Sequence, residues 1–326
     1  MAPQVVCLGE ALIDRIFDRR EGQRPDVPFW TDHPGGAPAN VAVALAKLGT
    51  PSALVACLGT DPQGQQVEAA LQEAGVDCAA LQWTSAHPTR VVLVNRDAQG
   101  ERTFVGFSLP APSCFADAYL EADQIDFSTF ESAQYLVMGT LGLAYGSLGQ
   151  SMRTAWVWAN QNGIITVVDL NWRPVFWPQP EQGISIIQAF LAQVDILKLN
   201  REEAETLFQT TQAGVIQSRL AAKLVLLTDG AKGCHYATAK LQGHVPAFTV
   251  DCEDSTGAGD SFLAGFLHQL TRQGMDLLEN EDPLRSAVQY ASAAGALTAT
   301  QPGAMTAQPN ARAVEAFLYL HNQLMT

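Results

Sequence analysis

The sequence has few basic residues and no long apolar run. Its 326 residues include 19 lysines and arginines against 33 aspartates and glutamates, a formal net charge of −14. Because affinity for nucleic-acid phosphates comes largely from Lys and Arg, this balance excludes a binder that works through a general basic surface. No segment offers the ~20 uninterrupted apolar residues that cross a bilayer. We therefore expect neither a nucleic-acid partner nor a membrane partner.

Paired cysteines and several common motifs are missing as well. The six cysteines are widely spaced without a CxxC pair, which disfavours a zinc ribbon or a disulfide scaffold and favours a reducing compartment. The start of the chain lacks a basic region followed by an apolar one, so we expect a cytoplasmic protein. GxSxG, HExxH and the Walker pattern GxxxxGK[ST] are absent, which disfavours those catalytic schemes and P-loop nucleotide binding.

Repeated apolar runs that end in Gly, Asp or Asn predict strands that alternate with helices. This alternation is typical of βαβ units and of a mainly parallel sheet flanked by helices. Right-handed crossovers bring the carboxyl ends of such strands to one edge, where ligands of open α/β sheets bind. We therefore predict an α/β fold with a single domain over residues 1–326. The predicted strands are Val5–Gly9, Ala53–Gly59, Tyr135–Gly139, Ile164–Asn171, Ile196–Asn200 and Leu224–Gly230.

One stretch departs from this alternation. Two apolar segments, Arg90–Asn95 and Arg102–Phe107, are joined by a short polar turn with no helix between them. This pattern predicts a hairpin that leaves the main sheet. The polar segment Ile13–Pro34 also lacks a helical period and is expected to join the hairpin. Residues of about 13–34 and 88–110 are therefore predicted to form a small β lid.

The run Asp254–Phe262 carries the strongest chemical signal. Its glycines fall at the start of a predicted helix, where the first amide N–H groups lack intrahelical partners. Gly257 and Gly259 flank Ala258, so these amides are able to approach an anion closely. Asp260 beside them is able to accept the proton of an alcohol that attacks phosphorus. The run predicts a cradle for a transferring phosphoryl group, with a simple tight turn as the open alternative.

A second glycine turn lies near the amino terminus. Gly35 and Gly36 precede a predicted helix that ends at Gly49. Asn40 falls in the first turn of this helix, where its amide is able to donate and accept hydrogen bonds with a polyol. Asp14, after the first strand, is a second carboxylate able to bind hydroxyls. Each residue is also explained as a cap or a surface residue, so both interpretations stay open.

The two glycine-containing segments together resemble a known family. Gly35–Gly49 and Asp254–Phe262, in this order, resemble the signatures of the ribokinase-like, or pfkB-type, carbohydrate kinases. Val5–Glu10 and Thr228–Gly230 also fall at family-like positions, so the resemblance covers nearly the whole chain. It implies a ribokinase-like fold and an ATP-dependent kinase acting on a small-molecule sugar.

The resemblance also implies roles for individual residues. Asp260 matches the catalytic base, and the backbone of Gly257, Ala258 and Gly259 matches the anion hole. The implied substrate-binding residues are Asp14, Gly35, Gly36, Asn40, Arg102 and Arg173. The implied nucleotide-binding residues are Lys198, Asn200, Glu203, Thr228, Gly230, Lys232, Gly257, Gly259 and Ser292.

Two cation sites follow from the same resemblance. Asn200 and Glu203 match an NxxE motif that organises Mg²⁺ and phosphate largely through water, as suits an ion that keeps several waters. Asp254, with the backbone around Thr256 and Gly303, matches a site where many relatives bind a monovalent cation, usually K⁺. A helix N-cap role explains Asn200 and Asp254 as well, and the alternatives stay open.

The choice of sugar rests on two further segments. Asp169–Pro174 resembles the DxNxR segment of fructokinases and of 2-keto-3-deoxygluconate kinases, and Arg173 offers a planar charged fork to phosphate or substrate oxygens. An ion pair between Arg173 and a neighbouring carboxylate is the alternative. Gly100–Phe104 is similar to the lid strand of fructokinases, whereas Phe107–Pro112 lacks the arginine that many of them carry. That absence disfavours a carboxylated sugar more than a neutral hexose.

The resemblance therefore favours phosphorylation of fructose to fructose 6-phosphate. A kinase for 2-keto-3-deoxygluconate, ribose or a nucleoside is one alternative, and Phe104 and Phe107 are the aromatic residues available to a nucleoside. A catalytically silent sugar-binding regulator is the other. Ser292 stands where many relatives carry Asn or His beside adenine, yet ATP remains the implied nucleotide. Edges of the predicted lid allow either a monomer or a homodimer through the lid.

Overall fold

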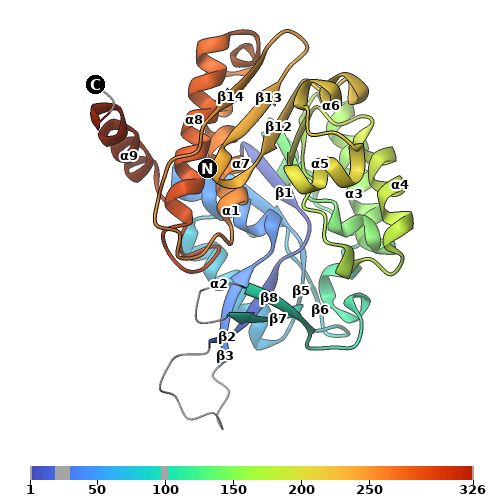
Figure 1. Ribbon diagram of the computed structural model, residues 1–326. Helices are drawn as coiled ribbons and strands as arrows, with labels where there is room; N and C mark the ends of the chain where they lie inside the picture. The colour runs from blue at the N-terminus through green and yellow to red at the C-terminus, as the bar shows by residue number, and fades with distance from the viewer. Residues whose placement is uncertain (1, 19–29, 97–101, 325–326) are drawn as a thin grey trace.

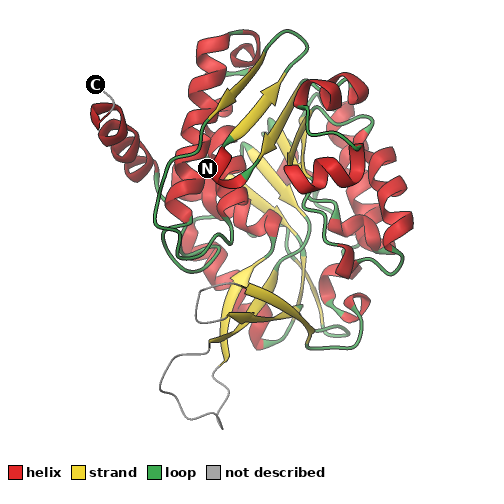
Figure 2. Ribbon diagram, viewed as in Figure 1, coloured by secondary structure: helices red, strands yellow, loops and turns green. Residues whose placement is uncertain are grey.

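A computed structural model describes residues 2–18, 30–96 and 102–324 of the chain. Eight strands form a central sheet in the order β14-β13-β12-β11-β10-β9-β1-β4. The strands are drawn as yellow arrows in Figure 2. The strands from β12 to β4 in this order are parallel, and β13 pairs antiparallel with both β12 and β14. The bounds are β1 Val5–Leu8, β4 Ser52–Val55, β9 Tyr135–Met138, β10 Ile165–Asp169, β11 Ile196–Asn200, β12 Leu224–Thr228, β13 Cys234–Ala237 and β14 Gln242–Val245.

Helices cover both faces of this sheet (Figure 1). Along β1, Val5 and Cys7 belong to the core shared with α1, α7 and α8, whereas Val6 and Leu8 belong to the core shared with α3 to α6. Strands buried on both faces explain why the parallel strands are continuous apolar runs. The helices are α1 Ala37–Leu48, α2 Pro62–Ala74, α3 Gly146–Gln161, α4 Pro180–Leu191, α5 Arg201–Phe208, α6 Ala213–Leu220, α7 Ala258–Gln273, α8 Glu281–Thr298 and α9 Ala311–Leu324.

Short 3-10 helices fill several connections. They are η1 Pro112–Cys114, η2 Ala116–Tyr119, η3 Ala122–Gln124, η4 Phe127–Phe130, η5 Leu141–Ala144, η6 Pro174–Phe176, η7 Gly230–Lys232 and η8 Met275–Glu279. In the ranges 2–18, 30–96 and 102–324, no helix is long and apolar enough to span a bilayer.

The predicted α/β fold with a mainly parallel sheet is confirmed, with one strand to correct. The predicted strand Ala53–Gly59 is wrong as a single element, because the chain forms β4 and then β5 (Cys57–Gly59) in another sheet. The residue between them, Ala56, accepts a hydrogen bond at its carbonyl from the N–H of Gln82, the first residue of β6 (Gln82–Thr84). An apolar run indicates only that a segment is buried. This segment stays buried while it changes partner strands, so its sequence does not show the break.

A smaller sheet lies at one end of the molecule, below the central sheet in Figure 1. Its order is β3-β2-β7-β8, with bounds β2 Leu12–Asp18, β3 Trp30–Gly35, β7 Val91–Arg96 and β8 Arg102–Phe107. The antiparallel pairing of β7 with β8 confirms the predicted hairpin. Residues 19–29 and 97–101 of the predicted lid lie outside the described residues.

Candidate active site

The predicted anion loop leads directly into α7. Gly257 is the N-cap residue of this helix and has a φ of 77°, in the left-handed region that favours glycine. A β-carbon at this position would lie 2.9 Å from the carbonyl oxygen of Ala304. Only glycine therefore allows the loop to lie this close to the neighbouring backbone, and Ala258 and Gly259 follow as the first helical residues.

Asp260 and Asn40 join the two signature segments. Asn40 Nδ2 donates a hydrogen bond of 2.8 Å to Asp260 Oδ2, although the residues are 220 positions apart. Burial, together with the nearby Asp169, raises the pKa of Asp260 to about 6, although Lys198 and the Asn40 hydrogen bond act in the opposite direction. A half-buried carboxylate of this kind is ionised at neutral pH and basic enough to accept a proton.

The Gly35-Gly36 turn packs against the start of the chain. Gly36 has a φ of 105°, and a β-carbon there would lie 2.5 Å from the carbonyl oxygen of Glu10. A β-carbon on Gly35 would lie 2.8 Å from Asp14 Oδ2, so this carboxylate lies against the turn. The structure thus brings together four of the predicted sugar residues: Asp14, Gly35, Gly36 and Asn40.

Glu10 is a residue of this region that the sequence analysis did not single out. Its Oε1 accepts a hydrogen bond of 3.3 Å from Ala37 N–H at the start of α1. Burial raises the pKa of Glu10 to about 7. A carboxylate directly after the first buried strand was the available signal for it.

A buried ion pair lies at the ends of β10 and β11. Lys198 Nζ donates to both carboxylate oxygens of Asp169, at 3.0 and 2.8 Å. A β-carbon on Gly259 would lie 2.8 Å from the same Nζ, so the ammonium lies beside the anion loop. Asp169 was not among the predicted site residues, although its place at the end of a parallel strand was a signal for a site.

Asn200 and Glu203 form a capping box at the start of α5. The Asn200 side chain accepts from Glu203 N–H at 2.9 Å, and Glu203 Oε2 accepts from Asn200 N–H at 2.8 Å. Glu203 Oε1 accepts from Trp172 N–H at 2.8 Å and lies 3.9 Å from the guanidinium of Arg173, whose side chain is 54% exposed. The N-cap and ion-pair alternatives are therefore both present, and Arg173 stays near the site.

A cavity of about 400 Å³ runs up to the anion loop. Of the predicted nucleotide residues, Thr228, Gly230, Gly259 and Ser292 line it, as does Ala258 of the anion loop. Lys232 does not belong to this lining, and its side chain, which is 76% exposed, lies 3.7 Å from the carboxylate of Asp229. The cavity therefore connects three of the predicted nucleotide-side segments, on β12, α7 and α8.

Asp254 holds the anion loop to a second loop. Its oxygens accept hydrogen bonds from Thr256 N–H at 3.1 Å and Gly303 N–H at 3.0 Å, and the side chain is buried. The simple N-cap explanation for Asp254 is wrong, because Gly257 is the N-cap of α7. The three residues of the predicted K⁺ site thus lie together.

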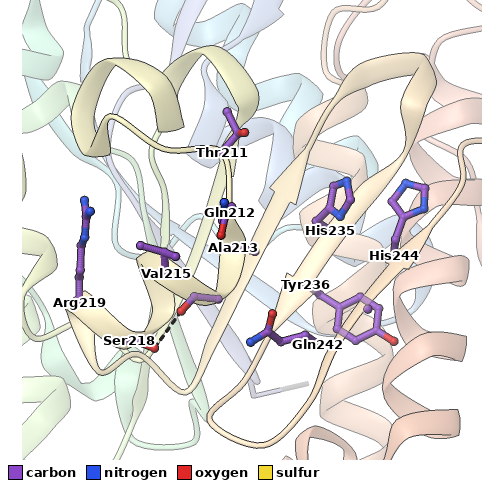
Figure 3. Close-up of a pocket in the computed structure, with 12 residues that line it drawn as sticks. Thr211, Gln212, Ala213, Val215, Ser218, Arg219, His235, Tyr236, Gln242 and His244 are labelled. Atoms are coloured by element: carbon purple, nitrogen blue, oxygen red, sulfur yellow. Dashed lines mark hydrogen bonds between the residues drawn. The ribbon is translucent and has the colours of Figure 1, made fainter.

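Other predicted positions lie apart or are only partly described. Arg102 belongs to β8, and its side chain lies outside the described residues. No three His, Cys, Asp or Glu side chains within ranges 2–18, 30–96 and 102–324 converge as a metal centre. A larger hollow of about 870 Å³ lies between α6 and the β13–β14 hairpin (Figure 3), and its lining residues, including His235 and His244, belong to neither signature segment.

The fold and this arrangement define an α/β phosphotransferase with an anion loop at a helix start. The chain matches the family model for pfkB family carbohydrate kinases over residues 2–311, and it belongs to this family. The enzyme is therefore an ATP-dependent carbohydrate kinase.

Several relatives that match this chain over most of its length are named fructokinases. The chain is 34% identical over 318 residues to a protein named probable fructokinase-6, chloroplastic, of Arabidopsis thaliana, covering 96% of this chain and 82% of the relative. It is 32% identical to fructokinase-1 of Zea mays, covering 94% of each chain.

Solved structures of fructokinases are also similar to this chain. Fructokinase from Xylella fastidiosa with bound ATP superposes with a TM-score of 0.89 at 31% identity, covering 99% of this chain and 100% of that one. A double mutant of fructokinase from Vibrio cholerae O395, with fructose, ADP and potassium bound, gives a TM-score of 0.84 at 33% identity, with coverage of 97% and 98%.

Proposed function

We propose that this kinase transfers the γ-phosphoryl group of ATP to the primary hydroxyl of fructose, giving fructose 6-phosphate and ADP. The hydrogen bond of 2.8 Å between Asn40 and Asp260 carries the proposal, because it joins the sugar turn to the anion loop. Proteins named fructokinase match nearly the whole chain, which supports fructose as the acceptor.

Asp260 acts as the base in this reaction. It accepts the hydroxyl proton while the sugar oxygen bonds to the γ-phosphorus and the bond to the bridging oxygen of ADP breaks. Backbone amides of Gly257, Ala258 and Gly259 stabilise the oxygens of the migrating group. ATP fits the cavity lined by Thr228, Gly230 and Ser292, because this cavity ends at the same loop.

Cations complete the nucleotide side of the site. Asn200 and Glu203 would hold Mg²⁺ through water, since each Glu203 oxygen already accepts one backbone N–H and keeps further acceptor capacity. Bound Mg²⁺ neutralises charge on the polyphosphate. A monovalent cation such as K⁺ would lie near Asp254, Thr256 and Gly303, where it fixes the anion loop. The shared loop contacts of Asp254 support this position.

The smaller sheet serves as a lid over the sugar in a single-domain enzyme. Phe107 packs at ring-centroid distances of 4.9 Å from Phe176 and 6.1 Å from the buried Phe115, while Phe104 is 38% exposed. Phe107 thus packs against core aromatic side chains, and Phe104 is the exposed ring on β8. One exposed ring disfavours a clamp of two rings around a nucleobase. Closure of the lid excludes water as a competing acceptor.

The remaining expectations about the setting of the enzyme belong to the same proposal. We place it in the cytoplasm, as monomer or lid-paired homodimer, and its six free thiols suit a reducing compartment.

A panel of acceptors tests the proposal. ADP release is measured with fructose, ribose, 2-keto-3-deoxygluconate and a nucleoside at equal concentrations, with Mg²⁺ and K⁺ present. We expect the highest kcat/KM with fructose and slow ATP hydrolysis when no sugar is present. A higher kcat/KM with another acceptor would reassign the substrate, and no transfer to any acceptor would favour the silent sugar-binding regulator.

A further inference from the structure

The Asp169–Lys198 pair differs from an ordinary ion pair in where it lies. Both side chains are almost fully buried, with 5% and 9% exposure, at the ends of neighbouring parallel strands. Burying an ion pair costs desolvation energy that its mutual attraction barely offsets, so such a pair is weak evidence for a stabilising role. Its position therefore needs another explanation.

The ammonium of Lys198 lies next to the anion loop and has a donor to spare. An ammonium has three N–H donors, and Asp169 accepts from two of them. No acceptor for the third lies among the residues that the structure describes. Gly259 of the anion loop is a close neighbour of this ammonium, because a β-carbon at that position would lie only 2.8 Å from Nζ. The missing side chain at position 259 leaves the cation next to the anion loop.

Charge around this cation also fits a role toward phosphate. The carboxylates of Asp169, Glu203 and Asp260 all act on the Lys198 ammonium and favour its charged form. A transferring phosphoryl group would bring further negative charge against these carboxylates. A fixed, dry cation offsets that charge without any reorganisation during the reaction.

We propose that Lys198 is a catalytic residue that stabilises the migrating phosphoryl group together with the anion-loop amides, and that Asp169 is the positioning residue that holds it there. This inference rests on the proposed function. It goes beyond nucleotide binding, because Lys198 contacts the phosphoryl group while that group is being transferred. Lys198 takes no proton in this step, since Asp260 receives the proton of the sugar hydroxyl.

The test compares three variants with a matched control. Lys198→Met removes the charge and keeps the length, whereas Lys198→Arg keeps the charge. The double variant Asp169→Asn/Lys198→Met removes both charges of the pair, so it avoids the unpaired Asp169 carboxylate that the single variant leaves, and we expect it to fold even if the single variant is unstable. Lys223→Met is the control, because Lys223 forms a Lys–Asp pair of 2.9 Å with Asp195 on the surface, with 49% of the lysine side chain exposed.

Two readouts separate catalysis from binding. Turnover with fructose should fall about 10²- to 10³-fold in Lys198→Met and in the double variant, as for loss of one oxyanion-hole donor, with partial recovery in Lys198→Arg. Affinity for ADP with aluminium fluoride, a mimic of the migrating phosphoryl group, should fall by a similar factor, while affinity for ADP alone and the Lys223→Met control stay unchanged.

Two outcomes would overturn the role of Lys198. One is unchanged turnover in the double variant, and the other is equal weakening of ADP and of ADP with aluminium fluoride, which assigns Lys198 to nucleotide binding alone. Because the fluoride complex needs no particular sugar, a wrong choice of fructose leaves this measurement intact. Failure of the proposed function is therefore distinguishable from failure of this inference.

Discussion

Two buried cation–carboxylate pairs of the same type have very different surroundings. Lys198 Nζ binds Asp169 and lies beside Gly259 in the glycine loop at the start of α7. Arg90 and Asp117 lie at the base of the lid with 0% and 1% exposure and form two hydrogen bonds of 2.7 and 2.9 Å. Burial and charge alone therefore do not show whether such a pair lies at the candidate active site.

The rings around Arg90 explain the contrast. Four aromatic side chains place their centroids 5.1 to 5.6 Å from its guanidinium carbon. Their faces attract the cation and exclude water and ligand from it. The rings come from β8 and from the body of the protein, so this pair fastens the lid to the body. They are Phe107, Phe115, Tyr145 and Phe176.

The largest expected effect is a loss of chemistry at the glycine-loop end. Asp260→Asn keeps the shape of the side chain but removes the proposed base, so turnover with fructose should fall by about 10² to 10⁴. The thermal midpoint and the ATP affinity should stay near those of the native protein. Turnover close to native would show that Asp260 is not the base. A large drop in the thermal midpoint would mean that Asp260, like Arg90, contributes to stability.

The second effect is on stability, at the lid end. Arg90→Met leaves Asp117 as an unpaired buried charge, so the free energy of unfolding should fall by about 3 to 5 kcal/mol, measured by urea denaturation. The double variant Arg90→Met/Asp117→Leu should recover part of this loss because it leaves no such charge. A loss below ~1 kcal/mol in the single variant would show that the pair does not fasten the lid.

A third effect is a shift in pH dependence. The hydrogen bond from Asn40 favours the ionised form of Asp260 and lowers its pKa, so Asn40→Ala should raise that pKa. The base works only when ionised, and the acid limb of kcat/KM for fructose should therefore move to higher pH. The position of the limb is compared and not its height, because Asn40 is also one of the proposed sugar-binding residues. A limb that stays in place would show that this contact does not tune Asp260.

The smallest effect is expected at the surface pair Lys223–Asp195. Exposed pairs are screened by water and typically contribute 0.2 to 1 kcal/mol, so Lys223→Met should change the free energy of unfolding by less than ~1 kcal/mol. Urea denaturation beside Arg90→Met checks this. A loss as large as that of Arg90→Met would mean that burial does not separate the two kinds of pair.

Local sequence patterns predicted much of this fold. The apolar runs of β9 to β12 and the glycine before α7 follow from local rules, since buried parallel strands are apolar and tight turns need glycine. The break between β4 and β5 was missed, because an apolar run does not record which strand it pairs with.

Side-chain contacts across the sheet were the harder part of the site. Asp260, Asn40 and the anion loop were predicted from local pattern and family resemblance, and the structure places them together. The partnership of Asp169 with Lys198, 29 positions apart, depends on the register of β10 against β11. The contact between Arg90 and Asp117 depends on how the smaller sheet packs against the rest of the protein. The contact of Glu10 with Ala37 N–H depends on how the Gly35-Gly36 turn packs against the start of the chain. Spacing in one sequence does not encode these contacts.

The pH profile of kcat/KM for fructose, in the native enzyme and in Asp260→Asn, tests the account most directly. Burial raises the pKa of Asp260 to about 6, so native kcat/KM should fall as the pH drops through that value. The residual activity of the variant should lack this acid limb. An acid limb shared by both proteins would contradict the claim that Asp260 is the base beside the anion loop.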